Sequence, residues 1–133
     1  MSRDHRKLQV FQMADTLALC LYRGTTGFPQ EERFGLQSQL RRGGVSIVAN
    51  IVEGAARRTT REYLHFLNVS LGSAAEVDYL LDLTGRLGYL DTVTLNSLRE
   101  QTGHLIPALK GLITALDAAE SSQSPRPKAQ SPG

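Results

Sequence analysis

Apolar residues recur at every third or fourth position through one continuous stretch of the chain, from Glu31 to Arg58. This is the spacing of an α-helix with one buried face. Pro29 presets the backbone angle of a first helical turn, so the pattern predicts a helix that begins near Glu31 and extends for roughly 40 Å. A helix with such a face has to pack against other helices. The apolar stripe consists of Leu36, Leu40, Gly43, Ile47, Ile51 and Gly54.

The same stretch carries a second stripe, which is polar. Its members also recur at threes and fours, and they are Gln39, Arg42, Ser46, Asn50, Glu53 and Arg57. One interpretation is a solvated helix face. The other is a hydrogen-bonded layer at a helix–helix or subunit interface. Apolar neighbours such as Ile51 and Val52 favour this layer, because a carboxylate in apolar surroundings needs a partner. Arg42 or Arg57 could be that partner for Glu53.

Gly43 and Gly44 lie in the middle of this predicted helix. Each costs about 1 kcal/mol of helix stability relative to alanine. The pair allows either the close approach of another helix or a local bend. The apolar spacing continues unbroken on both sides, which favours close packing.

Three further helices are predicted from the same kind of pattern. The first covers residues 8–26. The next begins at Thr59, the N-cap of a Thr-x-x-Glu capping box, and ends near Gly88. The last follows Asp91, a suitable N-cap, and carries an apolar seam at strict three–four spacing. The seam consists of Leu95, Leu98, Thr102, Leu105, Leu109, Leu112 and Leu116.

Four amphipathic helices with short connections predict an all-α protein, an up-down-up-down four-helix bundle formed by residues 1–117. Pro107 lies inside the last helix and predicts a kink there. The apolar stripes are wider than one bundle core needs, which predicts a homo-oligomer. Residues 118–133 are rich in Ser, Pro and Gln without apolar periodicity, so we expect a disordered tail.

The third predicted helix also has a patch of small and polar residues. One interpretation is a crossing point at which small side chains let two helices approach. The alternative is that Glu76 joins the polar stripe of the preceding helix in a shared layer, from which the loss of one partner would be costly. The candidate polar interface layer consists of Arg42, Asn50, Glu53, Ser73 and Glu76.

Several short motifs resemble those of one protein family, the 23S rRNA intervening-sequence proteins. The motifs are ERFGL at residues 32–36, QLRR followed by VSI at 39–47, N-x-x-EG at 50–54, EYLHFLNVSLGSAAE at 62–76 and RLGYL at 86–90. The resemblance covers about residues 8–116. It implies a four-helix bundle that assembles into a ring-forming homo-oligomer, often a pentamer. It implies no particular reaction.

Composition excludes several classes of protein. A single cysteine, Cys20, cannot form a disulfide framework or a cysteine metal cluster. The polar start of the chain lacks the apolar run of a signal peptide, and no apolar segment reaches membrane-spanning length. We therefore expect a cytoplasmic protein with no membrane partner.

One pattern is compatible with metal chemistry. Glu62 and His65 have the spacing used in ferritin-like di-iron bundles, which need this motif on two helices and two further glutamates. The chain offers the motif once, and Glu62 is already part of the capping box. Three scattered histidines form no catalytic triad, and no glycine-rich phosphate loop follows a strand. We predict no enzymatic activity, metal, cofactor or small-molecule substrate; a di-iron enzyme is the remote alternative.

Positive charge is concentrated around the second predicted helix, although the net charge of the chain is only +2. Between Arg33 and Arg61 there are six arginines and one acid, Glu53. A belt of them near the junction of the second and third helices, repeated around a ring, would multiply phosphate contacts. No aromatic residue interleaves with the belt, so any binding would read the nucleic-acid backbone or shape. The candidate nucleic-acid-binding residues are Arg41, Arg57, Arg58 and Arg61.

These observations support two functional hypotheses. The first is a non-enzymatic, homo-oligomeric scaffold that binds structured RNA or DNA. The second is a protein–protein adaptor whose arginines pair within the assembly. The chain also resembles, more distantly, the basic pentameric accessory proteins of diversity-generating retroelements. Those proteins partner a reverse transcriptase, so they are an example of the adaptor hypothesis.

Overall fold

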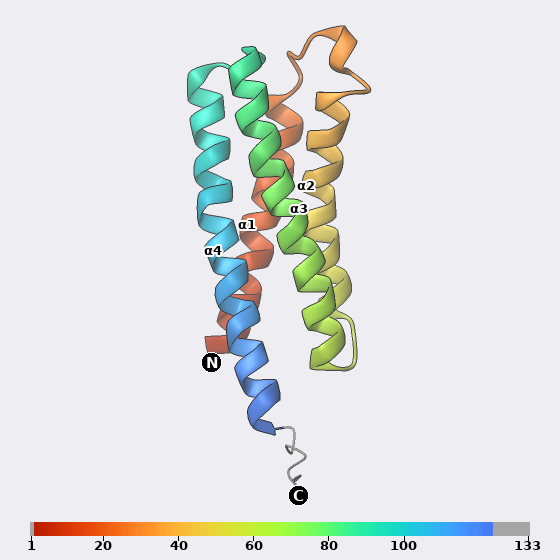
Figure 1. The fold of residues 1–133 in the computed structure, drawn as a ribbon, viewed down its shortest axis with the longest axis vertical. Helices are drawn as coiled ribbons and strands as arrows, with labels where there is room; N and C mark the ends of the chain where they lie inside the picture. The colour runs from red at the N-terminus through yellow and green to blue at the C-terminus, as the bar shows by residue number, and fades with distance from the viewer. Residues whose placement is uncertain (1, 124–133) are drawn as a thin grey trace, which may run out of the picture.

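The computed structural model describes residues 2–123 of the chain and contains only helices in that part. Figure 1 shows the helices side by side along one long axis. The α1–α2 and α3–α4 connections lie at one end of the molecule, and the α2–α3 connection lies at the other. The prediction of an all-α protein with four long helices is confirmed. The elements are α1 (Ser2–Gly24), the short 3-10 helix η1 (Gln30–Glu32), α2 (Leu36–Ala55), α3 (Thr60–Leu87) and α4 (Thr92–Gln123).

The predicted apolar stripes form the core between the four helices. The seam of α4 is buried from Leu98 to Leu116, whereas Leu95 at its start is only partly buried. Thr102, the polar member of this seam, donates a hydrogen bond of 2.6 Å to Asp78 on α3. The same core includes Leu17 and Leu21 on α1, Leu40 and Ile47 on α2, and Leu67 and Leu81 on α3.

The second helix begins at Leu36, and the predicted start at Glu31 is wrong. Residues 30–32 form η1, and the backbone then changes direction at Gly35 (φ −107°, ψ −114°). Glu32 explains the new start. Its carboxylate accepts a hydrogen bond of 3.0 Å from the Leu36 N–H, one of the N-terminal groups that have no partner within the helix. The helix ends at Ala55, before the predicted Arg58.

Three predicted helix ends are confirmed. Thr59 caps α3, and its hydroxyl accepts the Glu62 N–H at 3.1 Å. Gly88 terminates α3 with a left-handed backbone (φ 77°), which glycine adopts without steric cost. Asp91 precedes α4, and its carboxylate accepts the Thr94 N–H at 2.7 Å.

The fourth helix is longer than predicted. It continues through Pro107 and past residue 117 as far as Gln123. Residues 118–123, expected to belong to the disordered tail, are therefore helical. Residues 124–133, the remainder of that predicted tail, lie outside the described residues.

The glycine pair in α2 marks close packing on two sides of the helix, as predicted. A Cβ atom added at Gly43 would lie 2.6 Å from Val77 Cγ2 on α3. One added at Gly44 would lie 2.7 Å from Leu21 Cδ1 on α1. Real Cβ atoms do not approach other atoms so closely. The Val77 and Leu21 side chains therefore occupy space that is available only because residues 43 and 44 are glycines. Helix α2 is thus held tightly between α1 and α3.

Candidate functional site

A small polar layer joins α2 to α3. The hydroxyl groups of Ser46 and Ser73 share a hydrogen bond of 2.8 Å between the two helices. Asn50 donates from Nδ2 to the Ser46 carbonyl at 2.8 Å and to the Ser46 hydroxyl at 3.2 Å. One turn away, the buried Ser70 hydroxyl donates to the Ile47 carbonyl at 2.8 Å. Small side chains allow this close contact, and the three serine hydroxyls and the Asn50 nitrogen are hydrogen-bonded within it.

Two charged members of the predicted layer lie at its outer edge. Arg42 and Glu76 line a hollow of about 240 Å³ beside the serine pair, together with Gln39 and Gly43. Both side chains are exposed, and within the described part of the chain they form no ion pair with each other. The layer therefore consists of serine and asparagine hydrogen bonds, with the charges at its solvent-facing rim.

Glu53 makes no hydrogen bond within this layer in the described structure, but it does pair with Arg57, one of its two predicted partners. Its carboxylate is exposed and pairs with Arg57, which lies one turn further along the chain. A partner within the same stretch is therefore enough to satisfy the carboxylate.

The four candidate nucleic-acid-binding arginines do not form one belt. Arg57, Arg58 and Arg61 surround the α2–α3 connection. Arg41 lies in the second turn of α2, roughly 24 Å away along the helix axis. A helix of this length carries the two groups to opposite ends of the bundle (Figure 1).

Arg41 is used within the fold. Its Nε donates to the Thr25 hydroxyl and one terminal nitrogen donates to the Tyr22 carbonyl, both at 2.9 Å. The guanidinium also lies 4.8 Å from the centre of the Tyr22 ring. Tyr22 and Thr25 lie at the C-terminal end of α1, where carbonyl groups lack helical partners and a cation is favourable. Arg41 thereby stabilises the end of α1.

The other three arginines form a cluster with a lysine that the sequence pattern did not identify. Arg57 pairs with Glu53 and lies 4.8 Å from the centre of the Phe66 ring. Arg58 and Arg61 are exposed and have no ion-pair partner within the part of the chain that is described. Lys7 of α1 reaches the same end, with Nζ 5.2 Å from the centre of the Tyr63 ring. We call Lys7, Arg57, Arg58 and Arg61 the basic end.

Tyr63, beneath Lys7, carries an unusual hydroxyl group. The residue is 6% exposed, and its hydroxyl oxygen is buried without a hydrogen-bond partner in the described structure. Burial raises the pKa of Tyr63 above its usual value of 10.0, because the charged phenolate is poorly solvated there. The ring packs against Gly54, whose added Cβ would lie 2.8 Å from Tyr63 Cδ1.

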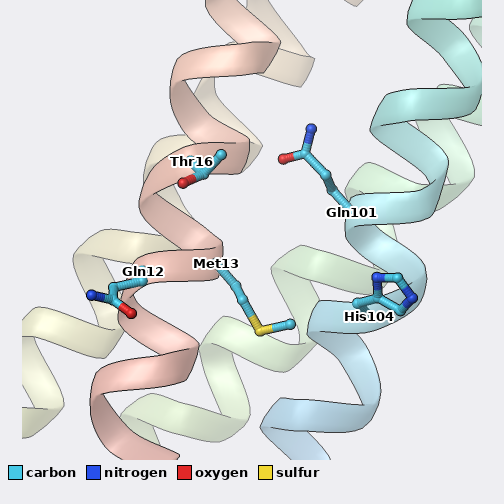
Figure 2. Close-up of a pocket in the computed structure, with 5 residues that line it drawn as sticks. All are labelled: Gln12, Met13, Thr16, Gln101 and His104. Carbon is cyan, nitrogen blue, oxygen red and sulfur yellow. The ribbon is translucent and has the colours of Figure 1, made fainter.

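An opening of about 300 Å³ lies between α1 and α4. Figure 2 shows Gln101 pointing toward Thr16, and Met13 pointing across to the side of His104. The Gln101 side-chain oxygen is buried without a hydrogen-bond partner in the described structure. The lining residues include no carboxylate and no cysteine, and His104 is the one strong metal ligand among them.

Possible metal ligands do not gather elsewhere in the described residues, where no group of three or more His, Cys, Asp and Glu side chains comes together. Glu62 and His65, the motif considered for a di-iron site, are both exposed, and His65 packs edge-on against Phe66 with 5.0 Å between the ring centres. Within residues 2–123, no helix combines the length and apolar character needed to cross a bilayer.

Comparisons with known proteins identify a family and a fold. The family model described as a 23S rRNA-intervening sequence protein matches residues 6–111, which confirms the resemblance seen in the motifs. A crystal structure from Bacteroides thetaiotaomicron, of a protein with unknown function from the S23 ribosomal protein family, has a TM-score of 0.76. It is 24% identical, and the match covers 82% of this chain and 98% of that one. No curated protein matches this chain.

Proposed function

This chain belongs to the 23S rRNA-intervening sequence protein family, and on that premise we propose that it is a non-enzymatic, homo-oligomeric scaffold that binds structured RNA or DNA in the cytoplasm. The observation that carries the proposal is the basic end. There Lys7, Arg58 and Arg61 have no acidic partner in the described structure, and Arg57 has one. Unpaired cations on an exposed surface are what phosphate groups bind.

Side chains, and not helix dipoles, supply the positive charge of this end. Both α1 and α3 begin here, while α2 and α4 end here (Figure 1), so the partial charges of the four helix termini offset one another. The cations come from two separate segments, the start of α1 and the α2–α3 connection. Because the affinity for nucleic acid grows with the number of phosphates contacted, a ring of copies would bind far more tightly than one.

An apolar outer face supports self-association. Leu8, Phe11 and Leu19 of α1 are exposed on the side away from the core, as are Val45 and Val52 of the neighbouring α2. A second copy of the chain is the occupant that we propose for this face, because its apolar side chains offer nothing to a phosphate backbone. In the assembly that we propose, up-down-up-down bundles associate through this face into a ring, and the pentamer implied by the family resemblance is the expected size.

The direct test is fluorescence anisotropy of a labelled RNA hairpin and a DNA hairpin of the same sequence, titrated with protein at several salt concentrations. The test variant replaces Arg57, Arg58 and Arg61 with Gln. We expect binding that weakens steeply with salt, and the variant should reduce the slope of log K against log salt by up to about 2.7, or 0.9 per lost phosphate contact.

A charge-matched control replaces Arg23, Arg86 and Lys110, which are exposed elsewhere on the bundle, with Gln. It loses the same formal charge and should retain the wild-type slope. If both triple variants weaken binding equally, the effect comes from net charge and the basic end is not a site. If the wild type binds neither hairpin at low salt, the scaffold hypothesis is wrong for nucleic acid.

The alternative function is a protein–protein adaptor, such as an accessory subunit of a reverse transcriptase. The hydrogen bonds of Arg41 to α1 favour it, because they show that an arginine chosen from the sequence as a phosphate ligand is used inside the fold. On this alternative the basic end would contact acidic residues of a partner protein. The hairpin titration separates the two functions, since an adaptor would bind neither nucleic acid.

A further inference from the structure

A second positively charged surface lies at the opposite end of the bundle, where α1 meets α2. A hollow of about 310 Å³ opens there between the end of α1, the segment after η1 and the first turns of α2. Three of its lining residues are arginines, two are aromatic, and none is acidic. We call it the arginine–aromatic hollow. It is lined by Tyr22, Arg33, Phe34, Gln37, Ser38, Arg41 and Arg42.

Phe34 is the most unusual residue in this hollow. It is 88% exposed, the highest value among the large apolar side chains of the described structure. Arg33 lies 5.5 Å from the centre of its ring, and Arg41 lies 4.8 Å from the centre of the Tyr22 ring. Each aromatic ring is thus accompanied by a guanidinium group, while most of the Phe34 ring remains open to solvent.

Glu32, the acid that precedes Arg33 in the chain, does not neutralise these arginines. Glu32 is turned toward the helices, where its carboxylate accepts hydrogen bonds from the Leu36 N–H at 3.0 Å and the Tyr89 hydroxyl at 3.2 Å. Within the described residues, Arg33 and Arg42 form no ion pair. The hollow therefore combines free positive charge with an accessible aromatic ring.

We propose that the arginine–aromatic hollow binds one unpaired nucleotide of a single-stranded segment of the nucleic acid. The base stacks on Phe34, and Arg33 and Arg42 contact the flanking phosphates. Aromatic rings beside cationic groups are the arrangement by which proteins bind single strands, because each base offers a π-face and each linkage a negative charge. The inference rests on the proposed nucleic-acid function and adds a site for unpaired bases to the basic end.

The geometry favours an unpaired nucleotide over a duplex. In a duplex the bases are stacked on one another and their faces are covered, so Phe34 would gain nothing. Arg41 is held by its bonds to Thr25 and the Tyr22 carbonyl, which keeps it fixed beside the Tyr22 ring. One wall of the hollow is therefore preorganised, and the more exposed Arg33 and Phe34 form the other.

The test compares a labelled single-stranded RNA of twelve uridines with a blunt RNA duplex, at one low salt concentration. The variant is Phe34→Leu, which keeps an apolar side chain and removes the aromatic ring. We expect single-strand binding to weaken by about 5- to 150-fold, the range for one stacked base. Duplex binding should change by less than about twofold, because only the single strand places a base on the ring.

Tyr79→Leu is the matched control, because Tyr79 is an exposed aromatic residue on α3 outside the hollow. It should leave both affinities unchanged. Circular dichroism and light scattering of each variant verify that fold and assembly are intact. If Phe34→Leu binds the single strand as tightly as the wild type does, and hairpin binding persists, the proposal for the hollow is wrong and the basic end remains a binding site. Absence of all RNA binding by the wild type would instead reject the function on which the inference rests.

An acidic peptide competitor of twelve glutamates completes the design. If the peptide displaces the single strand, and its own binding is as sensitive to Phe34→Leu as that of the RNA, the hollow recognises an acidic protein segment and our proposal is wrong. Weak displacement that is unaffected by Phe34→Leu supports recognition of the base.

Discussion

At the scale of single residues, the described structure contains both polar groups with partners and polar groups without them. Arg41 satisfies carbonyl and hydroxyl groups at the end of α1, and Ser70 satisfies the Ile47 carbonyl inside the α2–α3 contact. Tyr63 is the contrasting case, since its hydroxyl is buried with no partner within the described residues. A buried polar group without a partner loses its hydration and gains no compensating bond.

We therefore expect Tyr63→Phe to leave the fold intact and to raise the free energy of unfolding by about 1 kcal/mol at neutral pH. The change removes the unpaired hydroxyl and keeps the ring against Gly54. Urea unfolding followed by circular dichroism measures the effect. A loss of more than about 1 kcal/mol would show that the hydroxyl has a favourable interaction, for instance with an ordered water.

The same variant should change the response to alkaline pH. Burial raises the pKa of Tyr63 in the folded state above the unfolded value of 10.0. The unfolded protein then loses its proton first, so this contribution to stability is complete below pH 10 and is lost as the pH rises through the folded pKa. Wild type should lose stability between pH 9 and 11 more steeply than Tyr63→Phe. Tyr89, whose pKa is also raised by desolvation and by the neighbouring Glu32, is present in both proteins and cancels in the comparison.

At the scale of elements, the position of α2 depends on three glycines that face its neighbours. Gly43 faces α3 and Gly44 faces α1, while Gly54 faces the start of α3. Around Gly54 the nearest atoms are hard to move. An added Cβ would lie 2.8 Å from Tyr63 Cδ1, 2.9 Å from Phe66 Cβ and 3.3 Å from the Tyr63 carbonyl oxygen. The α2–α3 turn can be this tight because residue 54 has no side chain.

Gly54→Ala should therefore lower the free energy of unfolding by about 1–3 kcal/mol, because overpacking outweighs the gain in helix propensity. The matched control is Gly72→Ala on α3, where no atom lies within 4 Å of the added Cβ. That change should raise stability by about 0.5–1 kcal/mol. Thermal and urea unfolding of the two variants would contradict the packing argument if both shifted in the same direction.

At the scale of the whole molecule, the charged and apolar surfaces are separated. The basic end and the arginine–aromatic hollow occupy opposite ends of the bundle, and the apolar face of α1 and α2 lies between them. In the proposed ring, that face is covered by a second copy, and the two charged ends remain free on opposite sides of the ring. A strand that contacts both ends of several copies would bind with the strong salt dependence typical of many phosphate contacts.

Val52→Lys tests the assembly, because it places a charge on the exposed apolar face. We expect the mass measured by light scattering to fall toward that of a monomer, while helix content stays constant. Burying an unpaired charge in an interface is unfavourable by several kcal/mol. Val93→Lys, at an exposed position near the α3–α4 connection, should leave the mass unchanged. A Val52→Lys protein with the wild-type mass would place the subunit contact elsewhere.

Local chemistry made much of the fold predictable. Thr59, Gly88 and Asp91 mark helix ends through bonds and backbone angles that involve residues only a few positions away. The apolar seam of α4 follows from helical spacing alone. The start of α2 was misplaced because it depends on Glu32, whose carboxylate bonds both to the nearby Leu36 N–H and to Tyr89, far away in the sequence.

The candidate site was harder to predict, because its members are distant in sequence. Arg41 and Arg57 have similar sequence surroundings, yet one bonds to the end of α1 and the other pairs with Glu53. Lys7 joins the basic end only because α1 and α3 begin at the same end of the bundle, where the long Lys7 side chain reaches the Tyr63 ring. Phe34 and Tyr22 line one hollow because the segment that follows α1 lies beside the last turn of α1.

The sequence by itself determined that four helices form, three of their ends, the buried stripes and the family, because periodicity and capping act over three or four residues. Only the tertiary structure decided which arginines remain free for phosphate and which aromatic rings accompany them. Those outcomes depend on the ends of different helices meeting in space. Helical spacing predicts which face of a helix is buried. It does not predict which side chains of another helix lie beside the end of that helix.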